Sequence, residues 1–527
     1  MPAESRLAMD PSVRVTVACA TAVGAACLLV RACRRSRQNE SKRPPCAGGQ
    51  YGNLLHLLRM GSMTRACESW REKYGDVYFA ATPVMPNQCI VMDIDAMQKI
   101  IALDAKLGMT LWMPQAYETI RGAKDLQLLS GSAHKHWLRV LNPTVSPRAL
   151  DSYAPRLYAA FADMWRRAAA KDGEVIILNI VQRTKLRAMA DIFYGLTMPE
   201  GDAALDQMAK DFELCVNGSF AIPINLPGMQ YRKALKASAR IRGMLRDILR
   251  QELRRRAEAR ESAPVQSPGG GAVASRKPLR SAVEAIAELS ESADQSIRDS
   301  VASEDLVVAN LMLLLEAAHN TSSFATTALL CELHSPGNEA RLAKARGEAA
   351  EHLKRTGGVD AAIQPTTTEF QGLPYINACI DEVLRIYRFV GSIPKDLLAG
   401  QSVEAKGYTL EGPMTVTVQF GNSFLDPVLF PRPVEFLPER WLPDAPSDIA
   451  VSETARRAFL PFGFGAHICL GKNLARTSIK LSFLAMVAGG FEVELVGPLE
   501  RAHGLLPEVV VKGGGLARVT KSTTATT

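Results

Sequence analysis

Several common signatures are missing from this chain of 527 residues. Its ten cysteines are scattered and form no C-x-x-C pair, so neither a metal site of that type nor a disulfide framework is expected. Unpaired cysteines suit a reducing environment such as the cytosolic face of a membrane. The net charge of +8 is modest for this length, and basic residues are not interleaved with aromatics, which argues against a nucleic-acid-binding protein.

What is present favours one large domain. Hydrophobic residues make up 47% of the sequence, which is ample for a large core. β-branched and aromatic residues predict short strands at 75–79 and 88–92, and a long amphipathic helix rich in Arg and Lys is expected at 232–257. Glycine, proline and serine at 262–281 predict a flexible surface insertion within that domain. The expected fold class is mainly α with small β-sheets.

The N-terminal region predicts a membrane anchor at 15–30, preceded by a tail at 1–14. The apolar run is shorter than the ~20 residues that span a bilayer comfortably, and tilt or snorkelling arginines would make up the difference. Basic residues follow it in a linker at 31–46, which places the rest of the chain in the cytoplasm. A signal peptide or a transit peptide is the rival interpretation. We expect an endoplasmic reticulum membrane protein, or alternatively one of a plastid or other organelle membrane, with a body at 47–515 and a disordered tail at 516–527.

One cysteine, Cys469, stands in a glycine-rich loop just before an apolar stretch at 474–487 that predicts a helix. The amides of such a loop and the N-terminus of the next helix can stabilise the sulfur as a thiolate. A thiolate in an apolar setting is suited to be the axial ligand of a haem iron. Phe462 would pack beside that ligand, and His467 would pair with an anionic group such as a haem propionate. The alternative is a buried structural cysteine.

The spacing of this loop resembles the haem-binding signature of the cytochrome P-450 monooxygenases. The matching positions are Phe462, Gly465, His467, Cys469 and Gly471, with His where many members have Arg. Two more blocks occur upstream in the right order, and they resemble the Glu-x-x-Arg pair and the Pro-Glu-Arg-aromatic segment of the family. These blocks supply a charge triad that supports the haem core in the family, here Glu382, Arg385 and Arg440.

The resemblance covers roughly residues 40–515 and implies the P-450 fold as a single catalytic domain behind the anchor. It also implies haem b as cofactor, with Cys469 as the axial ligand of the iron. The implied activity is insertion of one oxygen atom of O2 into a lipophilic substrate. The alternatives are an isomerase or dehydratase of oxidised lipids on the same fold, which needs no external electrons, and a non-catalytic haem or lipid-binding protein.

An apolar segment at 306–333 predicts a buried helix that crosses the core. Within it, residues 317–322 resemble the oxygen-activation motif of the family. Ala317 would leave room for dioxygen, and the Thr321 hydroxyl would relay protons. The alternative is a hydroxyl that only bonds back to the carbonyl four residues earlier. Asn320 replaces the usual acid, so it can orient water but has no carboxylic proton.

Glu316 stands where members of the family usually have an apolar residue, four positions before Asn320. Burial would raise the pKa of its carboxyl group. That setting suits proton relay or recognition of a polar substrate group, and a water-satisfied structural residue is the alternative.

The resemblance further implies basic residues that clamp the haem propionates. Lys135 and Arg139 are the candidates from the segment around His134, where Leu138 fills the usual place of the arginine. Lys395 falls where the family commonly has an arginine. The alternative for each is a solvated surface base.

The stretch at 222–235 is similar to the branch that holds retinoic acid, abscisic acid and brassinosteroid hydroxylases. By analogy the substrate is a terpenoid, sterol, retinoid or carotenoid-like lipid. Lys472, Arg476 and Lys480 recur at helical spacing after the haem loop and predict a basic face. That face would dock an acidic, NADPH-dependent flavoprotein reductase, whereas an ordinary solvated helix face is the alternative.

Overall fold

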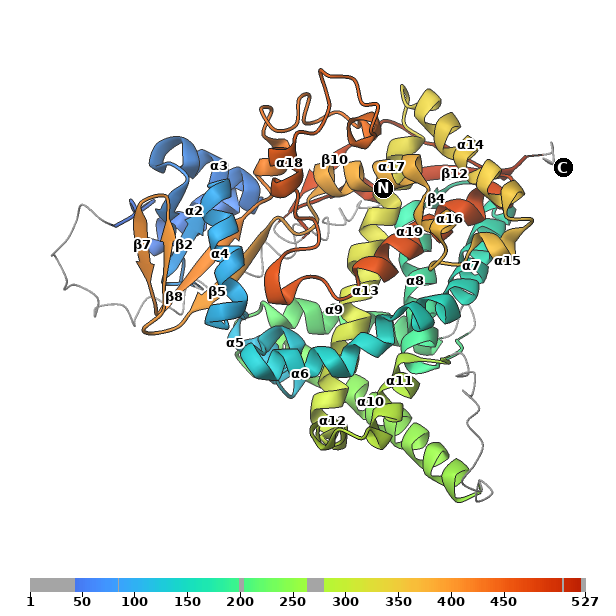
Figure 1. The fold of residues 1–527 in the computed structure, drawn as a ribbon, viewed down its shortest axis with the longest axis horizontal. Coiled ribbons are helices and arrows are strands. Elements are labelled where there is room, and N and C mark those ends of the chain that lie inside the picture. The colour runs from blue at the N-terminus through green and yellow to red at the C-terminus, as the bar shows by residue number, and fades with distance from the viewer. Residues whose placement is uncertain (1–42, 84, 199–202, 263–278, 505–506, 523–527) are drawn as a thin grey trace, which may run out of the picture.

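A computed structural model describes residues 43–83, 85–198, 203–262, 279–504 and 507–522. The molecule is mainly helical with small sheets, which confirms the predicted fold class (Figure 1). The helices are α2 (Gln50–Met60), α3 (Met63–Tyr74), α4 (Ile94–Leu107), α5 (Gln115–Arg121), α6 (Gly131–Leu141), α7 (Pro147–Ala170), α8 (Ile177–Tyr194), α9 (Ala203–Ser219), α10 (Gln230–Glu261), α11 (Ala282–Glu288), α12 (Gln295–Ala302), α13 (Glu304–Leu333), α14 (Glu339–Arg355), α15 (Val359–Ala362), α16 (Thr368–Gln371), α17 (Pro374–Tyr387), α18 (Glu453–Ala458) and α19 (Lys472–Ala488).

The largest sheet has the strand order β1-β2-β8-β5-β3, and within it only β2 and β8 run parallel. Smaller sheets pair β4 and β9 with β12, β6 with β7, and β10 with β11. The strands are β1 (Val77–Phe79), β2 (Gln88–Val91), β3 (Thr110–Leu111), β4 (Val175–Ile176), β5 (Ser392–Leu397), β6 (Ser402–Ala405), β7 (Tyr408–Glu411), β8 (Met414–Gln419), β9 (Phe491–Leu495), β10 (Arg501–His503), β11 (Val509–Val511) and β12 (Leu516–Lys521).

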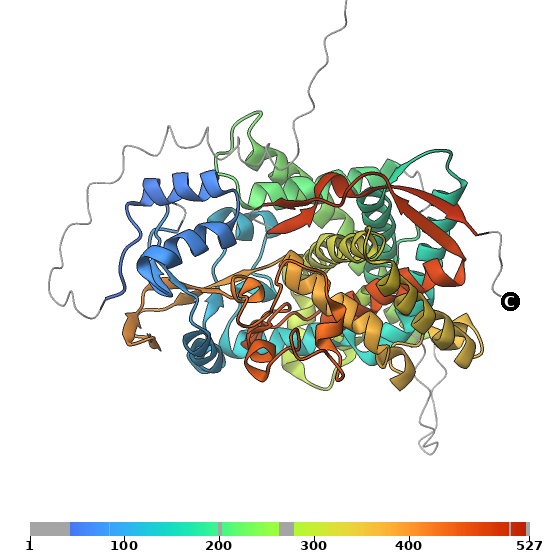
Figure 2. The same ribbon diagram turned by 90° about the horizontal axis from the view of Figure 1, so that it is seen from above.

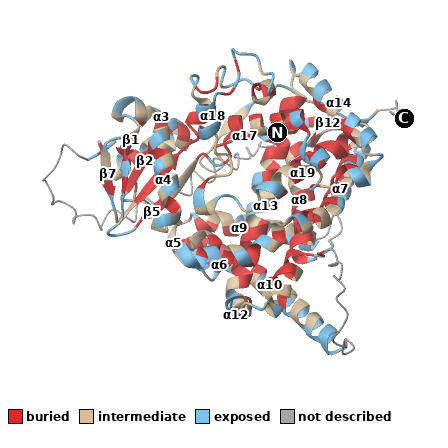
Figure 3. Cartoon of the chain, in the orientation of Figure 1, coloured by how far each residue is buried: buried red, intermediate tan, exposed pale blue. Residues whose placement is uncertain are grey.

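The five-stranded sheet lies with α2, α3 and α4 at one end of the molecule, and most of the helices lie at the other end (Figures 1 and 2). One large hydrophobic cluster fills the helical part, and a second one lies between the sheet and α4. Figure 3 shows that the buried residues concentrate where α8, α13, α17 and α19 come together. The core therefore surrounds α13.

The sequence of α13 explains its central position. The helix is apolar on nearly all sides and buried over most of its length, as predicted for 306–333. Two acidic residues, Glu304 and Asp305, stand in its first turn, where they interact favourably with the helix dipole. The helices predicted at 232–257 and 474–487 are α10 and α19, and the strands predicted at 75–79 and 88–92 are β1 and β2.

Two predicted boundaries are wrong. The tail expected at 516–527 begins with β12, which pairs with both β4 and β9, so the domain extends at least to Lys521. The insertion expected at 262–281 ends earlier, because Leu279 is buried and Ser281 caps α11 through a hydrogen bond from the Glu284 amide. The rest of that insertion lies outside the described residues.

The anchor predicted at 15–30 also falls outside the part of the chain that the structure describes. Among the described residues, no helix combines the length and the apolar character that crossing a membrane requires.

Candidate functional site

Cys469 lies between the short helix η7 (Gly465–His467) and the first turn of α19. Its backbone N–H donates to the Phe462 carbonyl at 2.9 Å, which closes the loop, and the cysteine itself is exposed. The surrounding protein raises the pKa of its thiol through desolvation, while a hydrogen bond from the Gly471 amide and the charge of Lys472 act in the opposite direction. The predicted interaction between a loop amide and the sulfur is thus present at Gly471.

The two glycines of the signature have different reasons to be glycine. Gly465 has a positive φ of 63°, and a Cβ there would lie 2.5 Å from Oδ2 of Asp104. A Cβ on Gly471 would meet nothing within 4 Å. The loop is therefore packed against α4 on one side and open beside the cysteine, where a flat group can approach the backbone.

The middle of α13 carries the second part of the site. Although residues on both sides along the helix are buried, Ala317 and Thr321 are exposed, one turn apart on one face. The Thr321 hydroxyl donates to the Ala317 carbonyl at 2.7 Å, so the back-bond that was the alternative interpretation does occur. Because α13 packs on α19, the exposed face of small residues on α13 lies on a helix that neighbours α19, and the exposed cysteine stands in the loop just before α19. These residues fit a flat haem with a thiolate ligand.

Asn320 faces a different neighbour. Its Oδ1 accepts a hydrogen bond of 3.4 Å from Nε2 of Gln182 on α8, and Nε2 of His319 contacts the Gln182 carbonyl at 3.1 Å. Lys185, one turn further along α8, is fully buried, and its Nζ donates to the Ser322 carbonyl at 2.7 Å. Burial holds the pKa of Lys185 well below its ordinary value. The polar side of α13 at Asn320 is therefore fixed to α8.

Glu316 forms an ion pair that the sequence did not predict. Its Oε1 lies 2.5 Å from Nη2 of Arg121, the last residue of α5, and Arg121 is only 1% exposed. Desolvation raises the pKa of the Glu316 carboxyl, and Arg121 opposes that shift. Glu316 and Asn320 are four positions apart on α13, yet their side chains have different partners. Glu316 pairs with Arg121 of α5, and Asn320 accepts from Gln182 of α8.

A buried polar group joins the haem loop to α4, α6 and β5. Lys395 Nζ lies 3.0 Å from Oδ1 of Asp104 and 2.8 Å from Nδ1 of His467, whose Nε2 donates to the Leu129 carbonyl at 2.9 Å. Burial lowers the pKa of Lys395, and Asp104 opposes that shift. The rings of His134 and His467 are tilted against each other, with centroids 4.2 Å apart, and burial lowers the pKa of His134 to about 4. Lys395 and His467 thus lie together, and both ring nitrogens of His467 already contact the protein. Their role as propionate-binding bases stays a prediction.

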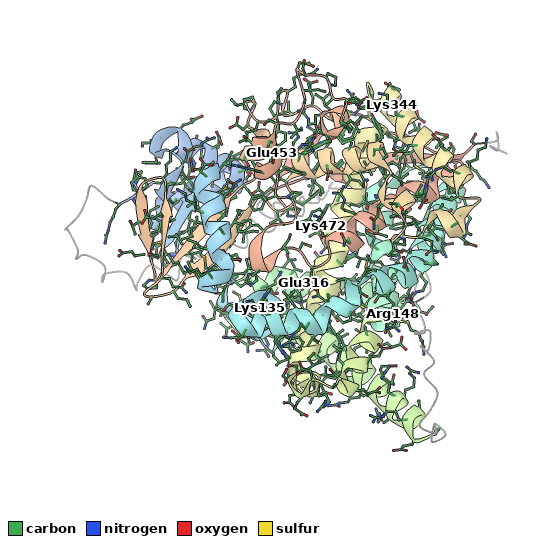
Figure 4. All side chains as sticks on the ribbon, viewed as in Figure 1. Lys135, Arg148, Glu316, Lys344, Glu453 and Lys472 are labelled. Carbon is green, nitrogen blue, oxygen red and sulfur yellow. The ribbon has the colours of Figure 1, made fainter. Side chains whose placement is uncertain are left out.

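The other two propionate candidates do not reach this group. Lys135 and Arg139 are both exposed on α6, and Arg139 pairs with Asp294 at 3.3 Å and with Nδ1 of His136. Figure 4 shows Lys135 on α6, apart from Lys472 beside the haem loop. The buried face of α6 presents His134 and Trp137 instead, so the role of Lys135 and Arg139 as clamps stays a prediction without support from this group of residues.

The predicted charge triad is assembled and completely buried. Both oxygens of Glu382 accept from Arg385, at 2.8 and 2.9 Å, and Arg440 donates to Glu382 at 3.1 Å. The Trp441 indole adds a bond of 2.9 Å to the same carboxylate. Arg385 also donates to the carbonyl of Pro433, so the triad ties α17 to the segment before η6 (Pro438–Trp441).

The basic face predicted on α19 is reduced to one lysine. Lys472 is exposed, but Arg476 pairs with Asp381 at 2.6 Å. Lys480 is only 4% exposed, and its Nζ donates to the Phe370 carbonyl at 3.0 Å. The three residues therefore do not form the expected docking surface.

Comparison with known proteins decides the family. Residues 44–506 match the family model described as "Cytochrome P450". The chain belongs to the cytochrome P-450 family. It is an oxidoreductase of the P-450 type, and the family implies a haem b cofactor with an axial cysteine thiolate, for which Cys469 is the residue of the signature. When bound to this P-450, that group would supply the chemistry of oxygen activation.

Three similar proteins illustrate the relationship. Cytochrome P450 26B1 of Rattus norvegicus is 25% identical over 437 residues, which are 82% of this chain and 77% of that protein. Ent-kaurenoic acid oxidase 2 of Arabidopsis thaliana is 24% identical over 480 residues, or 90% and 88% of the two chains. The solved structure "Retinoic acid bound cyanobacterial CYP120A1" has a TM-score of 0.70 at 21% identity and covers 91% of this P-450 and all of its own chain, which shows the common fold.

Sequence reasoning missed three residues around the site: Asp104, Arg121 and Lys185. Each comes from a helix distant in sequence from the residue that it contacts, and none belongs to a spaced motif. No signal marked Lys185 either, because it stands among polar residues of α8, Gln182 to Arg187, most of which are not buried.

Proposed function

We propose that this P-450 inserts one oxygen atom of O2 into a lipophilic, isoprenoid-derived substrate, with electrons from an NADPH-dependent flavoprotein reductase. The observation that carries the proposal is the exposed pair Ala317 and Thr321 in the middle of a helix that is buried over most of its length and packs on α19, the helix that follows the loop of exposed Cys469. A face of that kind leaves room for dioxygen and offers a hydroxyl. The relatives support the isoprenoid class, because the names of two similar proteins contain retinoic acid and ent-kaurenoic acid.

In this proposal each residue of the site has a limited task. Thr321 holds and passes a proton at its hydroxyl, and Ala317 keeps the adjoining surface small. Asn320, fixed by Gln182, orients water but gives no proton of its own. Lys395 and His467 would hold the haem carboxylates, His467 by exchanging its bond to the Leu129 carbonyl, and Asp104 holds Lys395 in place.

The test is oxygen incorporation. Haem-loaded protein, a flavoprotein reductase and NADPH are incubated with a panel of retinoids, diterpenes and sterols under isotopically labelled O2. A labelled product that depends on NADPH is expected. Product formed without NADPH indicates the isomerase or dehydratase alternative. That alternative is supported by Asn320, which stands where the family usually has an acidic residue. Binding without any product indicates a carrier.

We also propose that residues 15–30 anchor the protein in the endoplasmic reticulum membrane with the catalytic body in the cytoplasm. The support is the sequence alone, in which the apolar run is followed by basic residues and the prolines Pro44 and Pro45. Fractionation of tagged full-length protein tests this, and recovery in a plastid or mitochondrial fraction would contradict it.

A further inference from the structure

Three charged residues form a buried cluster beside the exposed stretch of α13. Arg121 lies 2.5 Å from Glu316 through Nη2 and 3.7 Å from Asp125 through Nε. The side chains of Arg121 and Asp125 are 1% and 0% exposed, whereas Glu316 is 17% exposed. Figure 4 shows Glu316 on the central part of α13. Glu316 is thus the member of the cluster that a bound molecule meets first.

The hydrogen-bonding capacity of this cluster is incompletely used. Asp125 is satisfied, because the Tyr117 hydroxyl donates to it at 2.6 Å and the Gln127 amide at 3.1 Å. By contrast, Oε2 of Glu316 and Nη1 of Arg121 are buried atoms without a hydrogen-bond partner among the described residues. The two members of one ion pair therefore keep an unused acceptor and an unused donor, although native proteins rarely leave buried polar atoms unpaired.

We propose that the Glu316–Arg121 pair binds a hydroxyl group of the substrate and so selects lipophilic alcohols over the corresponding carboxylic acids. This inference rests on the proposed monooxygenase function and specifies its substrate. A hydroxyl donates one hydrogen bond and accepts others. It can donate to Oε2 of Glu316 and accept from Nη1 of Arg121 at once, which completes both groups.

The charge of the cluster argues against a carboxylic acid. Two carboxylates, Glu316 and Asp125, already face one guanidinium, so a third carboxylate would meet net negative charge. An ammonium group would lose its hydration on entering this buried position, which costs far more than burying a hydroxyl. A neutral group that both donates and accepts is the best match.

The pair is also held rigidly, as a selective site requires. Arg121 is followed by Gly122, where a Cβ would collide with the guanidinium of Arg242 on α10. Five residues later the Leu126 amide donates to Oδ1 of Asn310 on α13 at 2.9 Å. The segment that carries Arg121 is thus attached to α13 at Glu316 and at Asn310, and the two groups of the pair are positioned before any ligand binds.

The experiment measures binding of matched alcohols and acids to the haem-loaded full chain. Retinol is compared with retinoic acid, and ent-kaurenol with ent-kaurenoic acid, by the substrate-induced spectral shift. The alcohols are expected to bind about ten- to a hundredfold more tightly, as a hydrogen bond to a charged group allows. Glu316→Gln removes one negative charge and should abolish the preference or reverse it.

Glu304→Gln, which makes the same change at the exposed start of α13, is the matched control and should keep the preference of the parent. If Glu316→Gln does not fold, the double variant Glu316→Gln with Arg121→Met removes both hydrogen-bonding groups of the pair but, because Asp125 remains, keeps the net charge of the cluster. It should therefore bind the alcohols more weakly than the parent and so narrow the preference. Tighter binding of the acids by the parent, no spectral shift with any alcohol, or an unchanged preference in these variants would each overturn the inference. Loss of labelled-oxygen incorporation with the preference retained would contradict the monooxygenase proposal alone.

Discussion

At the scale of single residues, the buried charges of this P-450 are compensated very differently. Glu382 is surrounded by Arg385, Arg440 and Trp441. Lys480 donates to the Phe370 carbonyl, and its Nζ lies 4.9 Å from the centre of the Phe370 ring. Burial lowers the pKa of Lys480 to about 8, because Glu348 and Asp381 offset only part of the cost of desolvation.

The lowered pKa predicts a pH dependence of stability. The folded protein gives up this proton near pH 8, whereas the unfolded chain holds it up to about pH 10.4. In that window the unfolded state binds more protons, so the free energy of unfolding rises with pH, by at most about 3 kcal/mol from this group. Lys480→Met should remove this rise. Urea denaturation at pH 7.5 and pH 10 measures it, with Lys472→Met as the matched control on the same helix. An identical pH dependence in Lys480→Met and the parent would refute the assignment.

At the scale of elements, the buried triad joins α17 to the segment that leads into η6. Replacing Arg440 by Ala leaves Glu382 buried with one fewer positive partner, which should cost about 3–5 kcal/mol. We expect little haem-loaded protein to accumulate, as read from the spectrum of the reduced carbon monoxide complex. Arg432→Ala removes an arginine that is 47% exposed and pairs with exposed acids, so its yield should match that of the parent. Normal haem content in Arg440→Ala would show that the triad is dispensable.

The exposed face of α13 makes a separate prediction. Thr321→Ala removes the hydroxyl at that face and should lower product formed per NADPH consumed by roughly tenfold or more, with hydrogen peroxide released instead. Ser323→Ala is the matched control, because Ser323 makes the same back-bond, to the His319 carbonyl, on the buried side. Coupling in Thr321→Ala equal to that of the parent would exclude the hydroxyl from proton delivery.

The sequence predicted residues that belong to short spaced motifs, but it did not predict contacts between residues far apart in the chain. Cys469 and Glu382 were predictable because spaced motifs a few residues long define them. Lys480 was misplaced because positions four apart advance around a helix by more than one turn, so residues 472 and 480 differ by about 80° and the later one faces the core. Arg121 was not predictable, since its contact with Glu316 joins residues that no local pattern relates.

At the scale of the whole molecule, the described body begins with contacts that do not need the predicted anchor. Phe79 of β1 donates to the Pro45 carbonyl at 2.8 Å, and the Ala47 amide donates to the Phe79 carbonyl at 2.7 Å. Deleting residues 1–42 should therefore leave haem content and the midpoint of thermal unfolding unchanged while releasing the protein from sedimented membranes. A truncated protein that still sediments with membranes would show that the body binds them by itself.

The strand at the end of the described chain has a consequence for biosynthesis. β12 pairs with β4, and Leu516 lies opposite Ile176, roughly 340 residues earlier. A ribosome takes on the order of tens of seconds to cover that distance. During this time β4 lacks the strand with which it pairs. The Ile177 amide at the start of α8 also lacks its acceptor, the Gly515 carbonyl. The sheet of β4, β12 and β9 can form only after nearly the whole polypeptide has been synthesised, and a premature stop codon before β12 removes more than a peripheral tail.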